Sequence, residues 1–391
     1  MTDAYDAAVV GAGPAGSAAA IALGRAGKRV LLLDRHAFPR DKPCGDLIGA
    51  RALAATKRLG IDAGDLAGYG RLAGATVTAA GGTLELAPRT ALGRVWLAGS
   101  DARVVPRCAF DHLLLRQAIA RGAEFRQGTV RVVERWDGET RLVRVESDGT
   151  SAEIAARAVI IAGGYGCRVA PDLAPRERDD GPPRGIATRG YFRDVRCPAD
   201  RIVFILDRWL LPGYGWVFPL PGGGANVGVG RLATGDDDRE GLKELWRRFT
   251  EDADSPAAAF LAGAAPDGLP RSWPLDLGPR RRRLVGDGLL VVGEAAGFVG
   301  PLTGAGIAFA LESGERAGAT VASALATGDC TRERLRPYGT VMRRRLAPWL
   351  RAELLAQRLL ADPGRVDALF AAVRPLPWTG VVGARLLLHL G

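Results

Sequence analysis

Three glycines near the N-terminus have the spacing of a phosphate-binding turn. Gly11, Gly13 and Gly16 lie in GAGPAG, between an apolar run at residues 5–10 and an alanine-rich segment typical of a helix. Such glycines permit a tight turn, the approach of a diphosphate, and close packing of helix on strand. Asp34 ends a second apolar run, where an acid can accept a hydrogen bond from a ribose hydroxyl. The residues expected at this dinucleotide site are Gly11, Gly13, Pro14, Ala15, Gly16, Asp34 and Arg35. This segment leaves open whether the dinucleotide is FAD or NAD.

A second chemical signal is the aromatic stretch LPGYGWVFP. Tyr214, Trp216 and Phe218 occupy alternate positions between Pro212 and Pro219. In an extended strand, alternate side chains share one face, so the three rings form one wall. That wall is either ordinary core or one side of a binding cavity.

The elements that position these residues predict an α/β fold. A chain of 391 residues is too long for one ordinary core, so at least two domains are expected. The first strand, helix and second strand form a βαβ unit of a Rossmann-like, dinucleotide-binding domain, interleaved with a β-sheet-rich substrate domain. We expect residues 1–70, 100–165 and 276–330 in the nucleotide domain, 71–99 and 166–275 in the substrate domain, and 331–391 in a C-terminal helical region.

Composition excludes several classes of function. Only four of the 53 basic residues are lysine, so the net charge of +10 reflects arginine usage, and nucleic acid is not an expected partner. The run from Arg280 to Arg283 is interpreted as a solvated loop. Five scattered cysteines and three histidines predict neither disulfides nor a metal site.

Localisation follows from the absence of any leader or spanning pattern in the sequence. No apolar run reaches the ~18 residues of a membrane helix, and no basic leader precedes the first motif, so a cytoplasmic protein is expected. The apolar tail VVGARLLLHL indicates core packing or an interfacial contact, and peripheral membrane contact stays open.

The segment from Gly286 to Gly318 resembles the late flavin-binding segment of the FAD-dependent monooxygenase and geranylgeranyl reductase superfamily. The resemblance implies that Glu294 binds the ribityl chain or a ribose and that residues 301–307 cover the flavin ring. The family usually has Asp at the position of Glu294 and often Glu at that of Ala305. VPRCAFDHLLLRQA resembles another family segment and implies a cofactor contact from Arg107. The cofactor contacts implied by resemblance are Lys42, Cys44, Gly45, Arg107, Glu294, Gly304, Ala305, Gly306 and Ile307.

Two further segments resemble the geranylgeranyl reductase branch. FPRDKPCGDLIGARAL is similar to its loop after the second strand, and LPGYGWVFP matches its PxxYxWxFP pattern. GIATRGYF resembles a strand of the same domain. The resemblance implies a cavity over the flavin, shaped for an apolar, prenyl-like chain. Its expected wall is Tyr191, Tyr214, Trp216 and Phe218.

The implied chemistry is hydride transfer from reduced flavin to a carbon–carbon double bond, with a proton delivered to the other carbon. Cys44, Tyr214 and Trp216 are the candidate catalytic residues, and Cys44 can equally be a buried apolar residue. Asp46 or Lys42 could instead tune the flavin. With a single GxGxxG, the electron donor is expected to be transiently bound NADPH or NADH, or a ferredoxin-like protein.

Two alternatives remain. One is a monooxygenase or oxidase acting on a polyketide-like, aromatic or carrier-bound metabolite, although Tyr165 replaces the acid of the monooxygenase Gly-Ala-Asp-Gly pattern. The other is a flavin-bearing protein without redox turnover. Halogenation fits less well, because YGWVFP does not reproduce the Trp-x-Trp-x-Ile-Pro pattern of halogenases.

Overall fold

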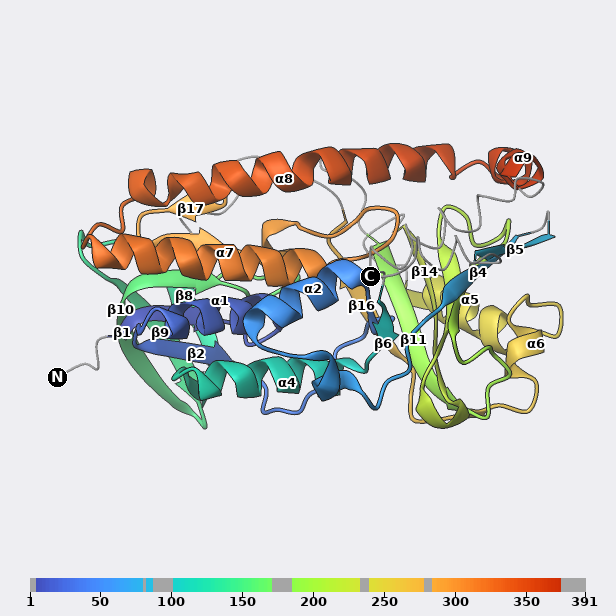
Figure 1. Cartoon of the computed structure of the whole chain (residues 1–391), viewed down its shortest axis with the longest axis horizontal. Coiled ribbons are helices and arrows are strands. Elements are labelled where there is room, and N and C mark those ends of the chain that lie inside the picture. The colour runs from blue at the N-terminus through green and yellow to red at the C-terminus, as the bar shows by residue number, and fades with distance from the viewer. Residues whose placement is uncertain are drawn as a thin grey trace.

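The structure is a computed structural model that describes residues 5–79, 82–86, 101–170, 185–232, 239–277 and 283–373. Figure 1 shows two sheets side by side, with helices packed around the first and one long helix extending over both. The apolar C-terminal stretch, most of the arginine run at 280–283, and residues 87–99 of the expected β-rich region lie outside the described residues.

The first sheet contains the predicted βαβ unit. Strand β1 (Tyr5–Val10) lies at its centre, parallel to β2 (Val30–Asp34) on one side and to β10 (Thr150–Ile161) on the other. The sheet is completed by β7 (Glu124–Gln127), β8 (Thr129–Val133), β9 (Arg141–Ser147), β17 (Val285–Gly286) and β18 (Leu289–Val291). The central strands β1 and β2 are mostly apolar and buried, as expected for parallel strands inside a sheet.

Helices α1 (Pro14–Arg25) and α7 (Ile307–Ala326) cross at very close range. A Cβ added at Gly314 would lie 2.0 Å from Ala15 O, and one at Gly318 would lie 2.5 Å from Ala19 O. Only glycine permits this crossing, which brings the N-termini of both helices to the same cavity. The remaining helices around this sheet are α2 (Ala50–Leu59), η1 (Ala63–Leu66), α4 (Arg107–Ala120), η4 (Gly293–Ala296) and α8 (Arg332–Leu359).

The second sheet has two faces of different character. Its strands, in spatial order, are β15 (Ala265–Pro266), β11 (Gly185–Arg193), β14 (Ala225–Leu232), β13 (Tyr214–Pro219), β12 (Arg201–Leu206), β4 (Gly74–Ala79) and β5 (Gly82–Leu86), and β16 (Arg271–Leu275) also pairs with β11. Val217 and Val227 face α5 (Arg239–Glu251), whose Phe249 packs over Gly215. Trp216 and Phe218 face the opposite side, as the alternation in sequence predicts.

Smaller elements join these layers. Strands β3 (Leu47–Ile48) and β6 (Arg103–Val104) form a two-stranded sheet, and η3 (Pro221–Gly223) and α6 (Ala258–Leu261) lie at the far end of the second sheet. Helix α9 (Pro363–Val373) packs on β4. The predicted α/β class is confirmed. Within the described ranges, no helix has the length and apolar character needed to cross a bilayer.

Candidate active site

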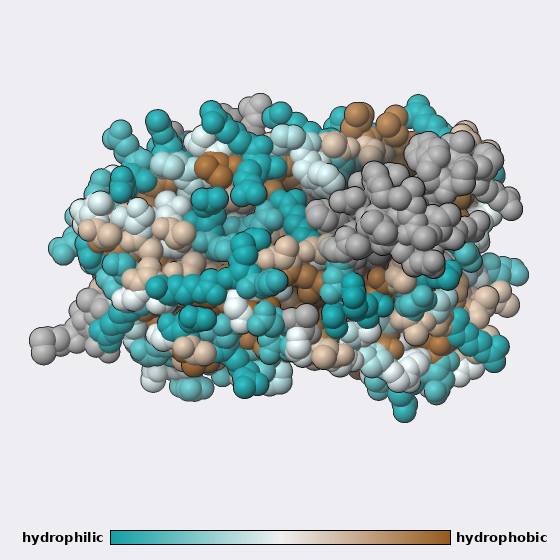
Figure 2. Space-filling model, in the orientation of Figure 1, coloured by the Kyte–Doolittle hydropathy of each residue, from teal (hydrophilic) through white to brown (hydrophobic). Residues whose placement is uncertain are grey.

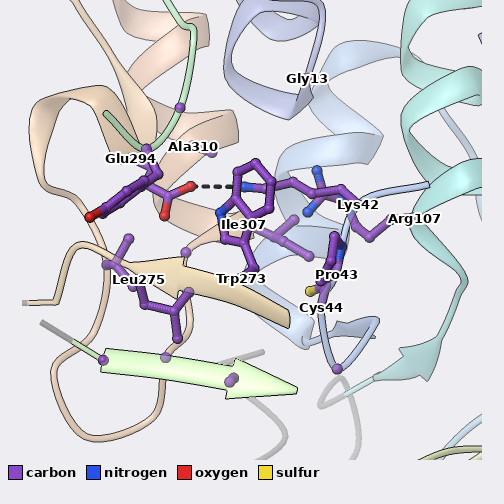
Figure 3. Close-up of a pocket in the computed structure, with 18 of the residues that line it drawn as sticks. Gly13, Lys42, Pro43, Cys44, Arg107, Trp273, Leu275, Glu294, Ile307 and Ala310 are labelled. Carbon is purple, nitrogen blue, oxygen red and sulfur yellow. Dashed lines mark hydrogen bonds and ion pairs between the residues drawn. The ribbon is translucent and has the colours of Figure 1, made fainter. Parts of the chain in front are cut away.

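A cavity of about 530 Å³ lies between the two sheets. Its lining comes from the glycine turn, the loop after β2, the aromatic strand β13 and the turn before α7, all distant in sequence. Figure 3 shows part of this lining. Nearly all predicted site residues meet here: Gly11, Gly13, Pro14, Ala15, Asp34, Arg35, Lys42, Cys44, Gly45, Arg107, Tyr214, Trp216, Phe218, Glu294, Gly304, Ala305, Gly306 and Ile307. Gly16 and Tyr191 do not line it.

The three glycines of the first turn have different surroundings. Gly11 has φ +104°, and a Cβ there would lie 2.5 Å from Ala162 O. A Cβ at Gly16 would lie 1.7 Å from Gly11 O, so Gly16 serves the packing of helix on strand. A Cβ at Gly13 would meet only Arg40 Nη2, at 3.4 Å. Gly13 therefore leaves open space on the cavity side, as a bound diphosphate requires.

Asp34 is held at the edge of this turn by two backbone groups. Its Oδ2 accepts the N–H of Ala12 at 2.9 Å, and its Oδ1 accepts the N–H of His36 at 3.0 Å. Each carboxylate oxygen can accept a second hydrogen bond, so capacity remains for a sugar hydroxyl.

Two arginines share one buried carboxylate beside the turn. Arg107 donates from Nε and Nη2 to Asp111, both at 2.7 Å, and Arg40 Nη1 lies 3.0 Å from Asp111 Oδ2. Arg40 Nη2 also lies 4.0 Å from Asp34 Oδ2, so Arg40 lies between two carboxylates. Guanidinium donors at this position, close to Gly13, suit a diphosphate. Arg40 was not predicted, although it lies within FPRDKPCGDLIGARAL, because its partner Asp111 is 71 positions away in the sequence.

Across the cavity, Lys42 Nζ donates to Glu294 Oε2 at 2.8 Å (Figure 3). The other carboxylate oxygen, Oε1, is buried and has no partner among the described residues. The ring of Trp273 lies 5.5 Å from Lys42 Nζ, and its buried Nε1 likewise has no described partner. A buried acceptor and a buried donor at one cavity indicate a polar ligand, because such groups are costly to leave unpaired. Trp273 was not predicted.

The turn before α7 is clamped from two directions. Glu353 of α8 accepts hydrogen bonds through Oε2 from Leu302 N (3.2 Å), Thr303 N (3.2 Å) and Thr303 Oγ1 (3.0 Å). On the other side, Tyr214 Oη donates to Thr303 O at 2.6 Å. Gln357, also on α8, donates to Pro301 O. Helix α7 has no side-chain cap at Gly306, so its first amides keep their donors toward the cavity.

The aromatic wall is both core and lining. Trp216 and Phe218 are buried, and Phe204 packs edge-on against Tyr214 and Phe218 with ring centroids 5.6 and 5.2 Å apart. Trp216 Nε1 donates to Asn226 Oδ1 at 2.9 Å. The polar atoms of Tyr214 and Trp216 therefore anchor the wall, and both rings remain part of the cavity lining.

Asp46 lies beneath the Cys44–Gly45 part of the lining and is completely buried. Its Oδ2 accepts hydrogen bonds from Tyr191 Oη at 2.7 Å and Asn226 Nδ2 at 2.8 Å. Burial raises the pKa of Asp46 to about 6. Tyr191 was predicted in the aromatic wall, but it does not line the cavity, because its hydroxyl points to Asp46. Asn226 Nδ2 also donates to Cys44 O at 2.7 Å, which fixes the loop.

Cys44 lines the cavity with its thiol protonated. Burial raises the pKa of this thiol, while Arg107 and Lys42 lower it less. At neutral pH the group is therefore a protonated thiol and not a nucleophilic thiolate. Burial also raises the pKa of Tyr214, so both hydroxyl and thiol hold their protons.

Comparison with known proteins agrees with this geometry. The family model described as FAD binding domain matches residues 4–181. Menaquinone reductase of Mycobacterium tuberculosis is 34% identical over 332 residues, covering 81% of this chain and 76% of the relative. Digeranylgeranylglycerophospholipid reductase 2 of Methanopyrus kandleri is 33% identical over 351 residues, covering 85% and 81%.

Among solved structures, a geranylgeranyl bacteriochlorophyll reductase-like protein of Thermoplasma acidophilum has the same fold. The TM-score is 0.83 at 23% identity, with 99% of this chain and 96% of that chain covered. The structural neighbour supports the fold, whereas the two sequence relatives support assignment of the chain to a family. Both are reductases that align with more than four fifths of this chain. The chain therefore belongs to the geranylgeranyl reductase family of FAD-dependent oxidoreductases.

Proposed function

We propose that this enzyme reduces a carbon–carbon double bond of an apolar, isoprenoid-like substrate. The proposal rests on one observation. A single cavity is lined by a glycine turn of the phosphate-binding type, by the unpaired polar atoms of Glu294 and Trp273, and by an apolar aromatic wall. The two relatives act, by their names, on menaquinone and on a digeranylgeranyl lipid, and both of these molecules carry prenyl chains.

The residues present fit FAD along the whole cavity. Asp34 is proposed to bind the adenosine ribose, and Gly13 with Arg40 the diphosphate. The unpaired Oε1 of Glu294 is proposed to accept a ribityl hydroxyl. The amides at the start of α7 would meet the pyrimidine edge of the flavin, where a helix N-terminus favours negative charge. When bound and reduced, FAD supplies a hydride.

The chain's own groups supply water exclusion and a proton. The wall formed by Tyr214, Trp216 and Phe218 keeps water from the double bond, which an unactivated alkene requires. We assign the proton to Cys44 Sγ, because this protonated thiol lines the cavity. The hydride and the proton from Cys44 would form the two new C–H bonds as the π bond breaks, and the thiolate left on Cys44 would regain a proton from solvent between turnovers. The hydroxyl proton of Tyr214 is already donated to Thr303 O, so Tyr214 is proposed to orient and not to protonate.

The electron donor is proposed to be NADPH or NADH bound transiently, or a ferredoxin-like protein. A single glycine-rich turn of the dinucleotide type in the sequence supports a donor without a permanent site of its own.

An anaerobic half-reaction tests the proposal. The FAD-loaded enzyme is reduced chemically, freed of excess reductant, and mixed without oxygen with geranylgeranyl-chain lipids and with menaquinone. We expect flavin absorbance to return and the lipid mass to rise by one H₂ for each reduced flavin consumed, because one flavin reduces one double bond. Reoxidation by air alone, with oxygen inserted into a substrate, would replace the reductase by the monooxygenase alternative.

Two cysteine variants test whether Cys44 is the proton donor. Cys44→Ala removes the thiol that lines the cavity, whereas Cys108→Ala removes a thiol on α4 that does not. We expect the first to slow alkene reduction by about 10²-fold or more, the usual contribution of a positioned acid, and the second to leave it unchanged. Equal rates in the two variants would remove Cys44 from the mechanism.

A further inference from the structure

Exposed leucines gather at the corner where α8 ends and α9 begins. Leu355 and Leu359 of α8 are 59% and 49% exposed, and Leu369 of α9 is 47% exposed. Leu355 and Leu359 are one turn apart and share a face. The described residues contain two other large hydrophobic side chains this exposed, Ile119 and Leu269, and both lie elsewhere. Figure 2 shows hydrophobic side chains at the upper edge of the molecule over this part of α8. We call Leu355, Leu359 and Leu369 the leucine corner.

Basic side chains surround the leucine corner. Arg351 and Arg358 lie on the exposed side of α8, and Arg365 is exposed on α9. Nearby carboxylates are engaged locally. Asp362 Oδ1 accepts the N–H of Arg365, and Asp367 is paired with Arg208. Leucines within a rim of arginines match a surface that is apolar inside and anionic at its boundary.

The inner side of the same segment reaches the cavity. Gln357 of α8 lines it, and Glu353 holds the turn before α7. Val366 and Phe370 of α9 belong to the same buried cluster as the aromatic wall. About one helix diameter, roughly 10 Å, therefore separates the leucine corner from the apolar end of the cavity.

We propose that the leucine corner docks on an anionic lipid bilayer. The leucines enter the boundary between headgroups and acyl chains, and Arg351, Arg358 and Arg365 contact lipid phosphates. Delivery of a lipid substrate through this contact rests on the proposed function. The binding itself does not, because it needs no turnover.

Vesicle co-sedimentation of the FAD-loaded enzyme tests the docking. The probe is vesicles of phosphatidylcholine and phosphatidylglycerol in equal parts, compared with phosphatidylcholine alone. We expect binding to the anionic vesicles and about tenfold weaker binding for Leu355→Glu/Leu359→Glu. Leu269→Glu, a matched change at an 85% exposed leucine elsewhere, is expected to bind as the parent does.

The contribution of Arg351 and Arg358 to vesicle binding can be tested against a charge-matched control on the same helix. Arg351→Gln/Arg358→Gln should weaken binding about 25-fold, since each arginine at an anionic surface contributes roughly fivefold. Arg334→Gln/Arg336→Gln makes the same charge change at exposed residues near the other end of α8, about 25 Å away. We expect it to have little effect.

Several results would overturn the docking surface. The first is an equal loss of vesicle binding in the two arginine double variants. The second is vesicle binding by Leu355→Glu/Leu359→Glu that equals that of the parent. The third is a parent dimer that this leucine variant dissociates, because a second copy of the chain would then cover the leucine corner. Retained FAD binding and melting temperature show that each variant is folded. Vesicle binding without alkene reduction would leave the docking intact and reject the proposed function. Reduction of a detergent-dispersed alkene without vesicle binding would reject the docking surface and support the proposed function.

Discussion

Glu353 and Thr303 are joined by two hydrogen bonds, from the N–H and the hydroxyl of Thr303, although 50 residues separate them in sequence. Glu353 is buried, and its Oε1 also accepts from Trp349 Nε1 at 2.8 Å. The carboxylate thus fixes the turn proposed to cover the flavin.

Replacing Glu353 should loosen that turn. In Glu353→Gln, one side-chain oxygen becomes a donor, so either the turn or Trp349 Nε1 loses its acceptor, and the charge that strengthens these hydrogen bonds is removed. We expect a loss of about 1–3 kcal/mol in the free energy of unfolding and about tenfold weaker FAD binding. Chemical unfolding and flavin fluorescence titration measure the two effects. Glu333→Gln, at an exposed position of α8, is the control. Parent-like FAD affinity in Glu353→Gln would show that the turn is set without it.

Tyr214 should behave as an anchor. Tyr214→Phe keeps the ring and removes the hydrogen bond to Thr303 O, so we expect a loss of about 0.5–1.5 kcal/mol in the free energy of unfolding. The rate of alkene reduction should stay within a few-fold of the parent. Single-turnover rates measure this directly, and a hundredfold fall would make Tyr214 the proton donor in place of Cys44.

Asp46 makes stability depend on pH. Its pKa of about 6 in the folded protein exceeds its ordinary value of 3.8, because burial outweighs the hydrogen bonds from Tyr191 and Asn226 and the charges of Arg189 and Arg107. Between these pH values the folded state binds more protons than the unfolded state. The free energy of unfolding therefore falls as pH rises, most steeply between about pH 4 and 6, by roughly 3 kcal/mol in total, and this contribution is constant above about pH 7.

Asp46→Asn isolates this effect. Asn tolerates the positive φ of 62° at this position and does not titrate. Urea unfolding at pH 4.5 and 7.5 should show the parent losing about 2 kcal/mol more than the variant across this interval. Parallel pH profiles for the two proteins would contradict the raised pKa.

Two glycines of the first turn should respond differently to alanine. Gly16→Ala places Cβ 1.7 Å from Gly11 O, so we expect little folded protein. Gly13→Ala places Cβ 3.4 Å from Arg40 Nη2, so the apoprotein should keep its melting temperature and bind FAD at least about tenfold more weakly. Calorimetry of the apoprotein and FAD titration distinguish the two outcomes. Unchanged FAD affinity in Gly13→Ala would move the diphosphate away from this turn.

Local patterns explain how much of the site could be predicted from sequence. The glycine turn, Asp34 and the alternating aromatics depend on spacing within one or two elements, and the structure brings them to one cavity. The pairing of Arg107 with Asp111, one helical turn apart, also follows from spacing.

The missed residues act across the fold. Trp273 and Glu353 lie outside every quoted motif, and Arg40 lies within FPRDKPCGDLIGARAL without a role of its own. Each acquires its role only when distant elements meet. Tyr191 shows the same limit. Its place in a strand was visible, but the direction of its hydroxyl depends on Asp46, 145 positions away.

Glu353 and Gln357 of α8, which hold the turn before α7, also affect when during synthesis the cofactor site can be completed. The glycine turn and Asp34 leave the ribosome before α8 does, and the strands around them can begin to pair early. Glu353 and Gln357 emerge much later. A nascent chain would therefore carry the proposed adenosine-binding half of its cofactor site long before the half proposed to cover the flavin. Loading with FAD is expected to become tight only once α8 has folded against the turn, which couples cofactor capture to the folding of α8.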